Sequence, residues 1–309
     1  MTTSITSGQK KQYQRLIEDA ASFGRNLALK KVPLDKDGLQ RLFEKGDDLK
    51  SAVAEVIVAQ TRELSRANQF ANEEVKSSYK YPKEYKGPKP LSQQIDALAK
   101  IFGLSLGYTS EFVEKVLPAL TLPDGAEGWF AIPSVDALAA RFFPEVKDPQ
   151  KRLCAASNLV LAKIGESRTF QNYRAGQLTP DRFRLNARTA HALDVLAEQQ
   201  KGDIWIVGGS FGKRHAGRSV RRAREVFVGQ EFGGHTVAAG SMLLTHPERL
   251  ISYDDLRMDI PGDEFDPDAD GSFGGAPLLV FVGDGVGFGT GWVDGPYGGC
   301  GSVSLFLPQ

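Results

Sequence analysis

Cysteine is scarce in this sequence, which holds only Cys154 and Cys300 among its 309 residues. A secreted disulfide framework normally needs more cysteines at closer spacing, so we expect two reduced, buried thiols. Long apolar runs are also missing, since no stretch reaches the roughly 18 apolar residues of a membrane-spanning helix. Residues 1–11 are polar and contain no apolar segment typical of a secretory signal. We therefore expect a cytoplasmic protein with no membrane partner.

Histidine is rare as well, and neither charge is in excess. The four histidines form no H-x-x-x-H pair and have no cysteine nearby, so the local sequence indicates no zinc site. The 38 basic residues balance the 38 acidic ones, and the field of the whole molecule favours neither nucleic acid nor an anionic membrane. Any charged partner must therefore be bound by a local patch.

Glycine and lysine are unevenly distributed along the chain. Thirteen lysines lie in residues 1–100, but only Lys201 and Lys213 lie in residues 201–309, which hold 22 of the 33 glycines. After Arg257 there is no lysine or arginine, whereas eight aspartates and glutamates follow. This contrast predicts a helix-rich first part and a glycine-rich, strand-rich, acidic end.

Apolar residues recur at three- and four-residue spacing along residues 13–27 and 49–64, which predicts two amphipathic helices. The segment 79–90 carries three prolines and cannot continue a helix, so it is the predicted linker. Further helical patterns are found at 92–102, 110–117, 148–165 and 180–199. The last of these is expected to start at Thr179 and Pro180, a capping residue before a proline.

Strand patterns occupy residues 203–207, 277–282, 286–292 and 302–307, and Gly283-Asp284-Gly285 predicts a hairpin turn. The expected fold class is α+β. A helical region over 1–120, with its linker near 79–90, precedes an α+β domain over 121–309. In this domain, helices near 134–199 pack on one face of a mainly antiparallel sheet that ends in a C-terminal β-meander.

The first candidate site is the Gly/Arg-rich segment 208–224, a glycine-rich loop that leads into a helix expected near Ser219. Free backbone N–H groups, a helix N-terminus and guanidinium groups together suit a phosphate. A P-loop is excluded, because only three residues separate Gly208 from Gly212 and Arg214 follows Lys213. The alternative is internal pairing with the acidic stretch 254–270. The candidate ligand-binding residues are Lys213, Arg214, Arg218, Arg221, Arg222 and Arg224.

The second candidate site is the acidic loop 263–270. Its alternating carboxylates resemble the opening of a calcium loop, although Pro277 stands where an EF-hand needs its bidentate carboxylate. A site for Ca²⁺ or Mg²⁺ is one interpretation, and a solvated loop is the other. The candidate metal ligands are Asp263, Glu264, Asp266, Asp268 and Asp270.

His215 is the candidate catalytic residue, because it lies among arginines that should lower its pKa and keep it neutral. Three hypotheses for function follow. The protein binds nucleic acid or another phosphate-rich ligand through segment 208–224. Alternatively, it is a metal-dependent enzyme that acts on a phosphorylated substrate, with His215 as general acid or base. In the third hypothesis it is a structural protein that forms homo-oligomers through its N-terminal helices.

Overall fold

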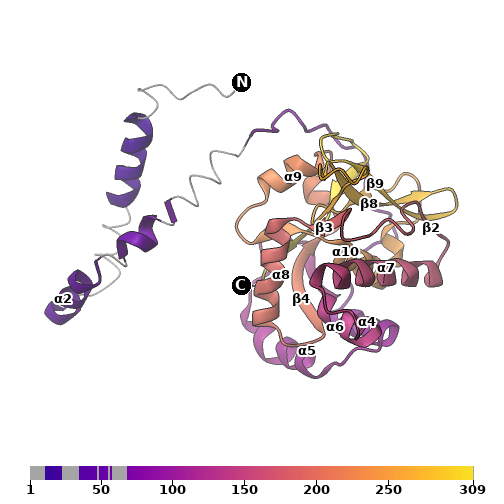
Figure 1. Ribbon diagram of the computed structural model, residues 1–309, viewed down its shortest axis with the longest axis horizontal. Helices are drawn as coiled ribbons and strands as arrows, with labels where there is room; N and C mark the ends of the chain where they lie inside the picture. The colour runs from indigo at the N-terminus through magenta and orange to yellow at the C-terminus, as the bar shows by residue number, and fades with distance from the viewer. Residues whose placement is uncertain (1–10, 23–34, 47–48, 55, 58–67, 309) are drawn as a thin grey trace. The chain divides into compact units, whose positions relative to one another are not determined.

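The computed structural model describes residues 11–22, 35–46, 49–54, 56–57 and 68–308. The chain divides after Ala67 into two compact units, residues 1–67 and 68–309 (Figure 1). This division differs from the boundary expected near residue 120. Residues 68–120, including the segment expected to be a linker, belong to the C-terminal unit.

The N-terminal unit is helical where it is described. Residues 11–22, 49–54 and 56–57 are helical, and α2 spans Lys36–Glu44. Asp35 lies at the start of α2, where its carboxylate accepts the backbone N–H of Gly38 at 2.6 Å. Parts of the two predicted apolar stripes, such as Phe23 and Leu64, lie outside the described residues.

Four helices of the C-terminal unit, α6, α7, α8 and α9, begin at side chains that cap them. Ser134, Asp148, Asn186 and Ser219 each accept the backbone N–H three residues further on, which satisfies a donor without an intrahelical partner. The helices are α4 (Leu91–Phe102), α5 (Gly107–Glu111), η1 (Phe112–Val116), η2 (Leu117–Ala119), α6 (Val135–Phe142), α7 (Pro149–Ser167), α8 (Ala187–Gln199), η3 (Lys213–His215), α9 (Val220–Val226), α10 (Thr236–Thr245) and η4 (Pro247–Arg249).

The strands form two sheets. The first is fully antiparallel, with strand order β1-β4-β11-β5. The second has the order β10-β6-β8-β7-β3, and β9 pairs with both β8 and β2. The strands are β1 (Gly128–Pro133), β2 (Phe170–Asn172), β3 (Phe183–Leu185), β4 (Ile204–Ser210), β5 (Glu231–Gly233), β6 (Arg257–Asp259), β7 (Asp263–Phe265), β8 (Gly275–Val282), β9 (Gly285–Trp292), β10 (Cys300–Ser302) and β11 (Ser304–Phe306).

These elements confirm the α+β class and the mainly antiparallel sheets. Consecutive strands β7, β8 and β9 pair antiparallel and form a C-terminal meander, in which the turn at Gly283 has a φ of 64°. The strand pattern at 302–307 does not extend this meander. Its strand β11 lies in the first sheet between β4 and β5.

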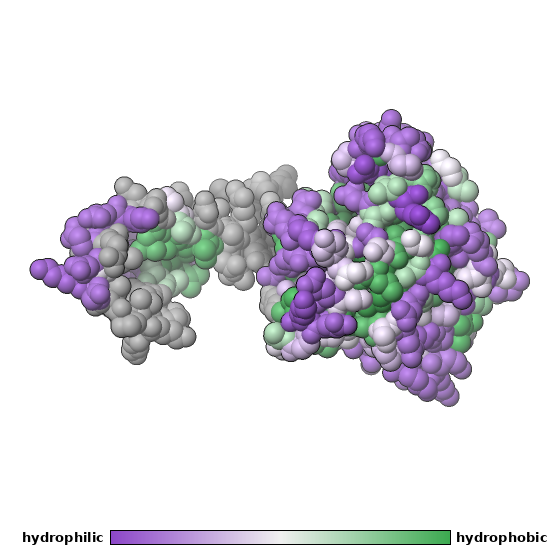
Figure 2. Space-filling view, turned by 90° about the horizontal axis from the view of Figure 1, so that it is seen from below, coloured by the Kyte–Doolittle hydropathy of each residue, from purple (hydrophilic) through white to green (hydrophobic). Residues whose placement is uncertain are grey.

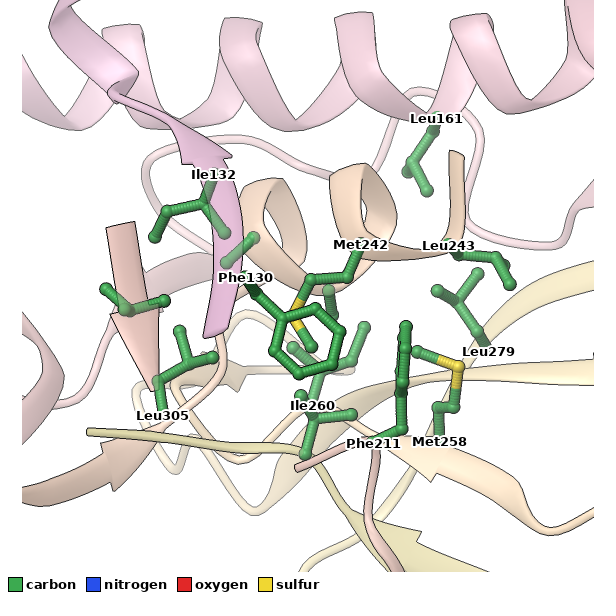
Figure 3. Packing of buried hydrophobic residues seen from close by; sticks show 14 of the residues in the cluster. Phe130, Ile132, Leu161, Phe211, Met242, Leu243, Met258, Ile260, Leu279 and Leu305 are labelled. Carbon is green, nitrogen blue, oxygen red and sulfur yellow. The ribbon is translucent and has the colours of Figure 1, made fainter. Parts of the chain in front are cut away.

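The first sheet is buried on both faces. Along β4, Trp205 and Val207 belong to one hydrophobic cluster, whereas Ile204 and Ile206 belong to another. Successive side chains of a strand point to opposite faces, so a strand covered on both sides is apolar throughout. In Figure 3, Phe130 and Ile132 of β1 lie near Met242 of α10 within the first cluster.

The helix α10 is a central element of this core. All but one of its ten residues are buried, and its sequence has no polar face, as expected for a helix surrounded by protein. It crosses α7 closely, since a Cβ at Gly240 would lie 2.6 Å from Cγ1 of Val160. Figure 1 shows α4, α5 and α6 at the end of the unit opposite β8 and β9.

Three further expectations concern the predicted linker, the two cysteines and membrane-spanning helices. The segment 79–90 packs into the C-terminal unit, where Tyr85 is buried with its ring edge-to-face against Phe211 at 5.5 Å. Both Cys154 and Cys300 are free thiols, the first buried and the second partly buried. Within the described part of the chain, no helix is long and apolar enough to cross a membrane.

Candidate functional site

The glycine-rich loop after β4 is shaped by backbone crossings. Gly212 has a φ of 112°, and a Cβ there would lie 2.4 Å from the carbonyl oxygen of Gly301. Gly217 has a φ of 82°, and its Cβ would lie 2.0 Å from the carbonyl oxygen of Val75. Both positions therefore require glycine for packing within the unit. The following helix α9 starts as expected, with Ser219 as its N-cap.

Three arginines of the predicted cluster pair with carboxylates. Arg218 and Arg222 bind Glu74, at 3.2 and 2.6 Å, and Arg222 also binds Glu225 at 2.8 Å. Arg221 pairs with Glu73. These partners come mainly from residues 73–74 and not from the acidic stretch 254–270.

Arg224 is also occupied within the unit. Its guanidinium donates to the backbone carbonyls of Pro261 at 2.8 Å and Asp263 at 2.7 Å. The carboxylate of Glu264 lies 3.9 Å from it. Arg214 pairs with buried Glu231 at 3.0 Å, so five of the six predicted ligand-binding cations are engaged in internal bonds.

Lys213 and Arg214 line an open cleft of about 400 Å³, together with Gly125, Glu127 and Ser210. The ammonium group of exposed Lys213 has no bonding partner among the described residues, whereas its backbone N–H donates to the hydroxyl of Tyr81 at 2.8 Å. We call the five lining residues the cleft.

Arg214 is held rigidly at the edge of the cleft. Its Nε donates to Oε1 of buried Glu231 at 3.0 Å, and its guanidinium lies 5.8 Å from the ring centre of Phe306. A Cβ at Gly125 would lie 1.8 Å from Nη1 of Arg214 and would displace the guanidinium from this position. The charge of Arg214 is thereby preorganised at the surface.

The floor of the cleft is a fixed carboxylate. Oε1 of Glu127 accepts hydrogen bonds from the hydroxyl of Tyr81 at 2.5 Å, Oγ of Ser210 at 2.7 Å and the backbone N–H of Phe211 at 3.2 Å. Behind it, the fully buried guanidinium of Arg249 lies 4.0 Å from the ring centre of Tyr81.

The lining of the cleft carries charges of both signs. The cations of Lys213 and Arg214 lie with the carboxylate of Glu127, and Arg214 is paired with Glu231. Burial lowers the pKa of Arg249, but an arginine side chain stays protonated in proteins. The cleft therefore offers the exposed ammonium group of Lys213 beside the guanidinium that Glu231 holds.

Ser210 lies at the centre of a G-x-S-x-G pattern over residues 208–212. In a nucleophile elbow the serine occupies a strained strand-to-helix turn and bonds a histidine. Here Ser210 is the last residue of β4, has no positive φ, and donates to Glu127. The geometry of a serine hydrolase is therefore not present at this serine.

His215 lies beneath the cleft and is buried. Its Nε2 lies 2.7 Å from Oε1 of Glu231, and Arg218 Nη1 lies 2.9 Å from its Nδ1. Because a guanidinium can only donate, Nδ1 accepts, and Nε2 carries the proton donated to Glu231. Burial lowers the pKa of His215, and the neighbouring arginines lower it further. The lowered pKa of His215 agrees with the direction expected from the sequence. Its principal cause, however, is burial and not the neighbouring arginines.

The acidic loop spreads its carboxylates over separate environments. Oδ2 of buried Asp263 accepts from Thr236, at 2.6 Å from the backbone N–H and 2.5 Å from the hydroxyl. Glu264 pairs with Arg184 at 2.8 Å. Asp263 therefore bonds at the start of α10, and Glu264 bonds a neighbouring strand.

The other three predicted ligands belong to the turn itself. Asp266 accepts the backbone N–H groups of Asp268 at 3.1 Å and Gly271 at 2.6 Å. Asp270 accepts that of Ser272 at 2.9 Å. Among the residues that the structure describes, no three or more His, Cys, Asp or Glu side chains are grouped so that they could hold a metal ion.

Several site residues were not identified from the sequence. Glu73 and Glu74 lie about 145 positions before the arginines that they bind, and nothing local marks them as partners. Glu127 follows a recognisable turn at Pro123–Gly125, but its bond to Ser210 joins β4 to a distant loop. Tyr81 stands in the segment that the sequence presented as a linker.

Comparison with known proteins gives no relative: no family model matches the chain, and neither a curated protein nor a solved structure is significantly similar to it.

Proposed function

We propose that this protein binds a phosphate-bearing ligand in the cleft, through Lys213 and Arg214. The observation that carries the proposal is the unpaired ammonium group of Lys213 beside the fixed guanidinium of Arg214 in a surface cleft. An ammonium group is a compact phosphate binder, and a guanidinium adds directional donors. The cleft thus contains two of the six predicted ligand-binding residues, of which Arg214 also pairs with Glu231.

The test uses a fluorescently labelled oligonucleotide at low salt, with inorganic tripolyphosphate as competitor. Lys213→Gln should weaken oligonucleotide binding about five- to tenfold, because one phosphate contact is lost. Lys100→Gln is the matched control, since Lys100 is exposed in the last turn of α4, and it should leave binding unchanged. Equal affinity of wild type and Lys213→Gln, or no binding at low salt, would contradict the proposal.

A second candidate function is self-association through the N-terminal unit. Its described helices expose apolar side chains at helical spacing: Tyr13 and Leu16, which is 62% exposed, and Leu49, Val53 and Val56, which is also 62% exposed. Figure 2 shows apolar atoms gathered on the surface of this unit. Side chains of this kind are normally covered by another helix.

A second copy of the chain suits this surface. Residues 11–57 contain nine lysines and arginines against eight aspartates and glutamates, and this mixture complements itself without a strongly charged partner. Light scattering on the full chain should give a dimer or larger assembly that Val53→Glu dissociates. Ser51→Glu introduces the same charge on another face of the helix and should leave the assembly intact. A monomeric wild-type chain would exclude this function.

A further inference from the structure

A cluster of aromatic rings around an unpaired guanidinium lies at the surface of the C-terminal unit. Tyr253 and Tyr297 are 57% and 44% exposed. The guanidinium carbon of Arg257 lies 5.4 Å from the ring centre of Tyr253 and 5.1 Å from that of Tyr297. The ring of Tyr79 lies 6.3 Å from that of Tyr297. We call these four residues the tyrosine–arginine patch.

Two rings of the patch pack closely against the backbone at Gly299. A Cβ at Gly299 would lie 2.5 Å from a ring carbon of Tyr297 and 3.2 Å from one of Tyr79. The backbone N–H of Arg257 donates to the carbonyl of Gly299 at 2.8 Å. The backbone at Gly299 therefore packs against the rings of Tyr79 and Tyr297. Tyr253 and Tyr297 nevertheless keep large exposed surfaces.

Arg257 differs from the arginines of α9 in having no ionic partner. Arg218, Arg221 and Arg222 each bind a carboxylate, but Arg257 forms no salt bridge within the described residues, and its Nε is buried without a hydrogen bond. Burial raises the pKa of Asp259, and the charge of Arg257 acts to lower it, but a guanidinium that forms no ion pair keeps donors available to an anion. Exposed rings beside such a charge suit a ligand with both flat groups and negative groups.

The patch and the cleft are joined through one short segment. Tyr79 belongs to the patch, whereas the hydroxyl of Tyr81 bonds Glu127 and the backbone of Lys213 in the cleft. Two residues along an extended chain span at most about 7 Å between their Cα atoms. Lys80, between them, is exposed, and its carbonyl accepts from Leu256 N at 3.0 Å, next to Arg257.

Backbone contacts also connect the loop of the cleft with the tyrosine–arginine patch. The backbone N–H of Gly217 donates to the carbonyl of Cys300 at 2.9 Å, and Ala216 forms a β-bridge with Gly301. The loop that carries Lys213 therefore runs beside the segment that carries Tyr297. A ligand only a few nucleotides long could contact both.

We infer that the phosphate-bearing ligand is a single-stranded nucleic acid, with its bases stacked on the tyrosine–arginine patch and its backbone phosphates at Lys213 and Arg214. This inference rests on the proposed function, because the cleft must bind phosphate. Stacking on aromatic rings needs unpaired bases, which a duplex does not offer. The rings of Tyr253 and Tyr297 supply the stacking surface, and Arg257 adds a cation beside it.

The experiment compares two labelled probes of about ten nucleotides, an oligothymidylate and an abasic deoxyribose-phosphate strand of equal length. The variant Tyr253→Ala/Tyr297→Ala should weaken oligothymidylate binding about tenfold or more, and leave abasic binding unchanged. Tyr253→Phe/Tyr297→Phe keeps both rings and should retain wild-type affinity. Tyr108→Ala removes another exposed tyrosine, 66% exposed on α5, and should change neither affinity.

The outcomes separate this inference from the proposed function. If both probes bind equally, the tyrosine variants have no effect and Lys213→Gln weakens both, the inference is wrong and the phosphate cleft stands. If neither probe binds at low salt, the proposed function fails and the inference fails with it. Tighter binding of a duplex than of either single strand, or of a neutral oligosaccharide lost in Tyr253→Ala/Tyr297→Ala, would also overturn the inference.

Discussion

Nε2 of His215 donates a hydrogen bond to Oε1 of Glu231 over 2.7 Å, inside a site where both side chains are buried. The same carboxylate oxygen accepts from Arg214 at the edge of the cleft. His215 therefore contributes to the cleft through Glu231, which fixes the guanidinium. Burial alone would raise the pKa of Glu231, but the bonds from His215 and the charge of Arg214 hold it below its usual value.

His215→Ala should destabilise the protein by about 3 kcal/mol, because it leaves a buried carboxylate without one donor and opens a cavity. Urea unfolding at neutral pH measures this loss. His191→Ala is the matched control, since His191 is exposed on α8, and it should change stability by less than about 0.5 kcal/mol. A stable His215→Ala protein would show that the bond to Glu231 is dispensable.

Asp263→Asn should change the pH dependence of stability. Burial raises the pKa of Asp263 to about 7, from an ordinary value of 3.8. The folded protein then binds more protons than the unfolded chain between these values, so the stability that this group contributes is lost as pH rises from about 4 to 7. Relative to wild type, the asparagine variant should gain about 4 kcal/mol over that range, measured by urea unfolding at several pH values.

His235→Gln should change the pH dependence in the opposite sense. Burial lowers the pKa of His235 to about 4 from 6.5. The unfolded chain therefore binds more protons between these values, and wild-type stability increases as pH rises from about 4 to 6.5. The variant should lose about 3 kcal/mol relative to wild type over the same range. Parallel pH profiles for wild type and this variant would contradict the burial of a neutral imidazole.

Gly212→Ala tests the interpretation of the glycine-rich loop as a backbone crossing. The added Cβ would lie 2.4 Å from the carbonyl oxygen of Gly301 at a φ of 112°, so a loss of about 3 kcal/mol or more is expected. Gly289→Ala in β9 is the control, because no atom lies within 4 Å of its Cβ. It should change thermal stability little. Equal melting temperatures for both variants would argue against the crossing.

The sequence predicted local elements better than the contacts between them. The hairpin of β8 and β9 was recognisable from its turn and alternating strand, and α4 and α7 from their apolar spacing. The helix expected over 180–199 begins only at Ala187. Residues 183–185 form β3 instead, paired with β7 about 80 positions later, and that long-range pairing overrides the helix signal of Pro180.

The candidate site was predictable only in part for the same reason. Composition located the cations of segment 208–224, but which of them are free depends on Glu73 and Glu74, which bind Arg218, Arg221 and Arg222 from far away in sequence. The prolines of segment 79–90 indicated a linker. Its tyrosines instead pack the segment into the C-terminal unit, since Tyr85 lies in the core and the hydroxyl of Tyr81 bonds the backbone of Lys213.

The salt dependence of oligonucleotide binding tests the central claim most directly. The logarithm of the association constant falls linearly with the logarithm of salt concentration, and the slope reflects the number of phosphate contacts. If Lys213 binds a phosphate, Lys213→Gln should reduce the magnitude of that slope by about one relative to wild type, whereas Lys100→Gln should keep it. An identical slope for wild type and Lys213→Gln would contradict the assignment of the cleft as the phosphate site.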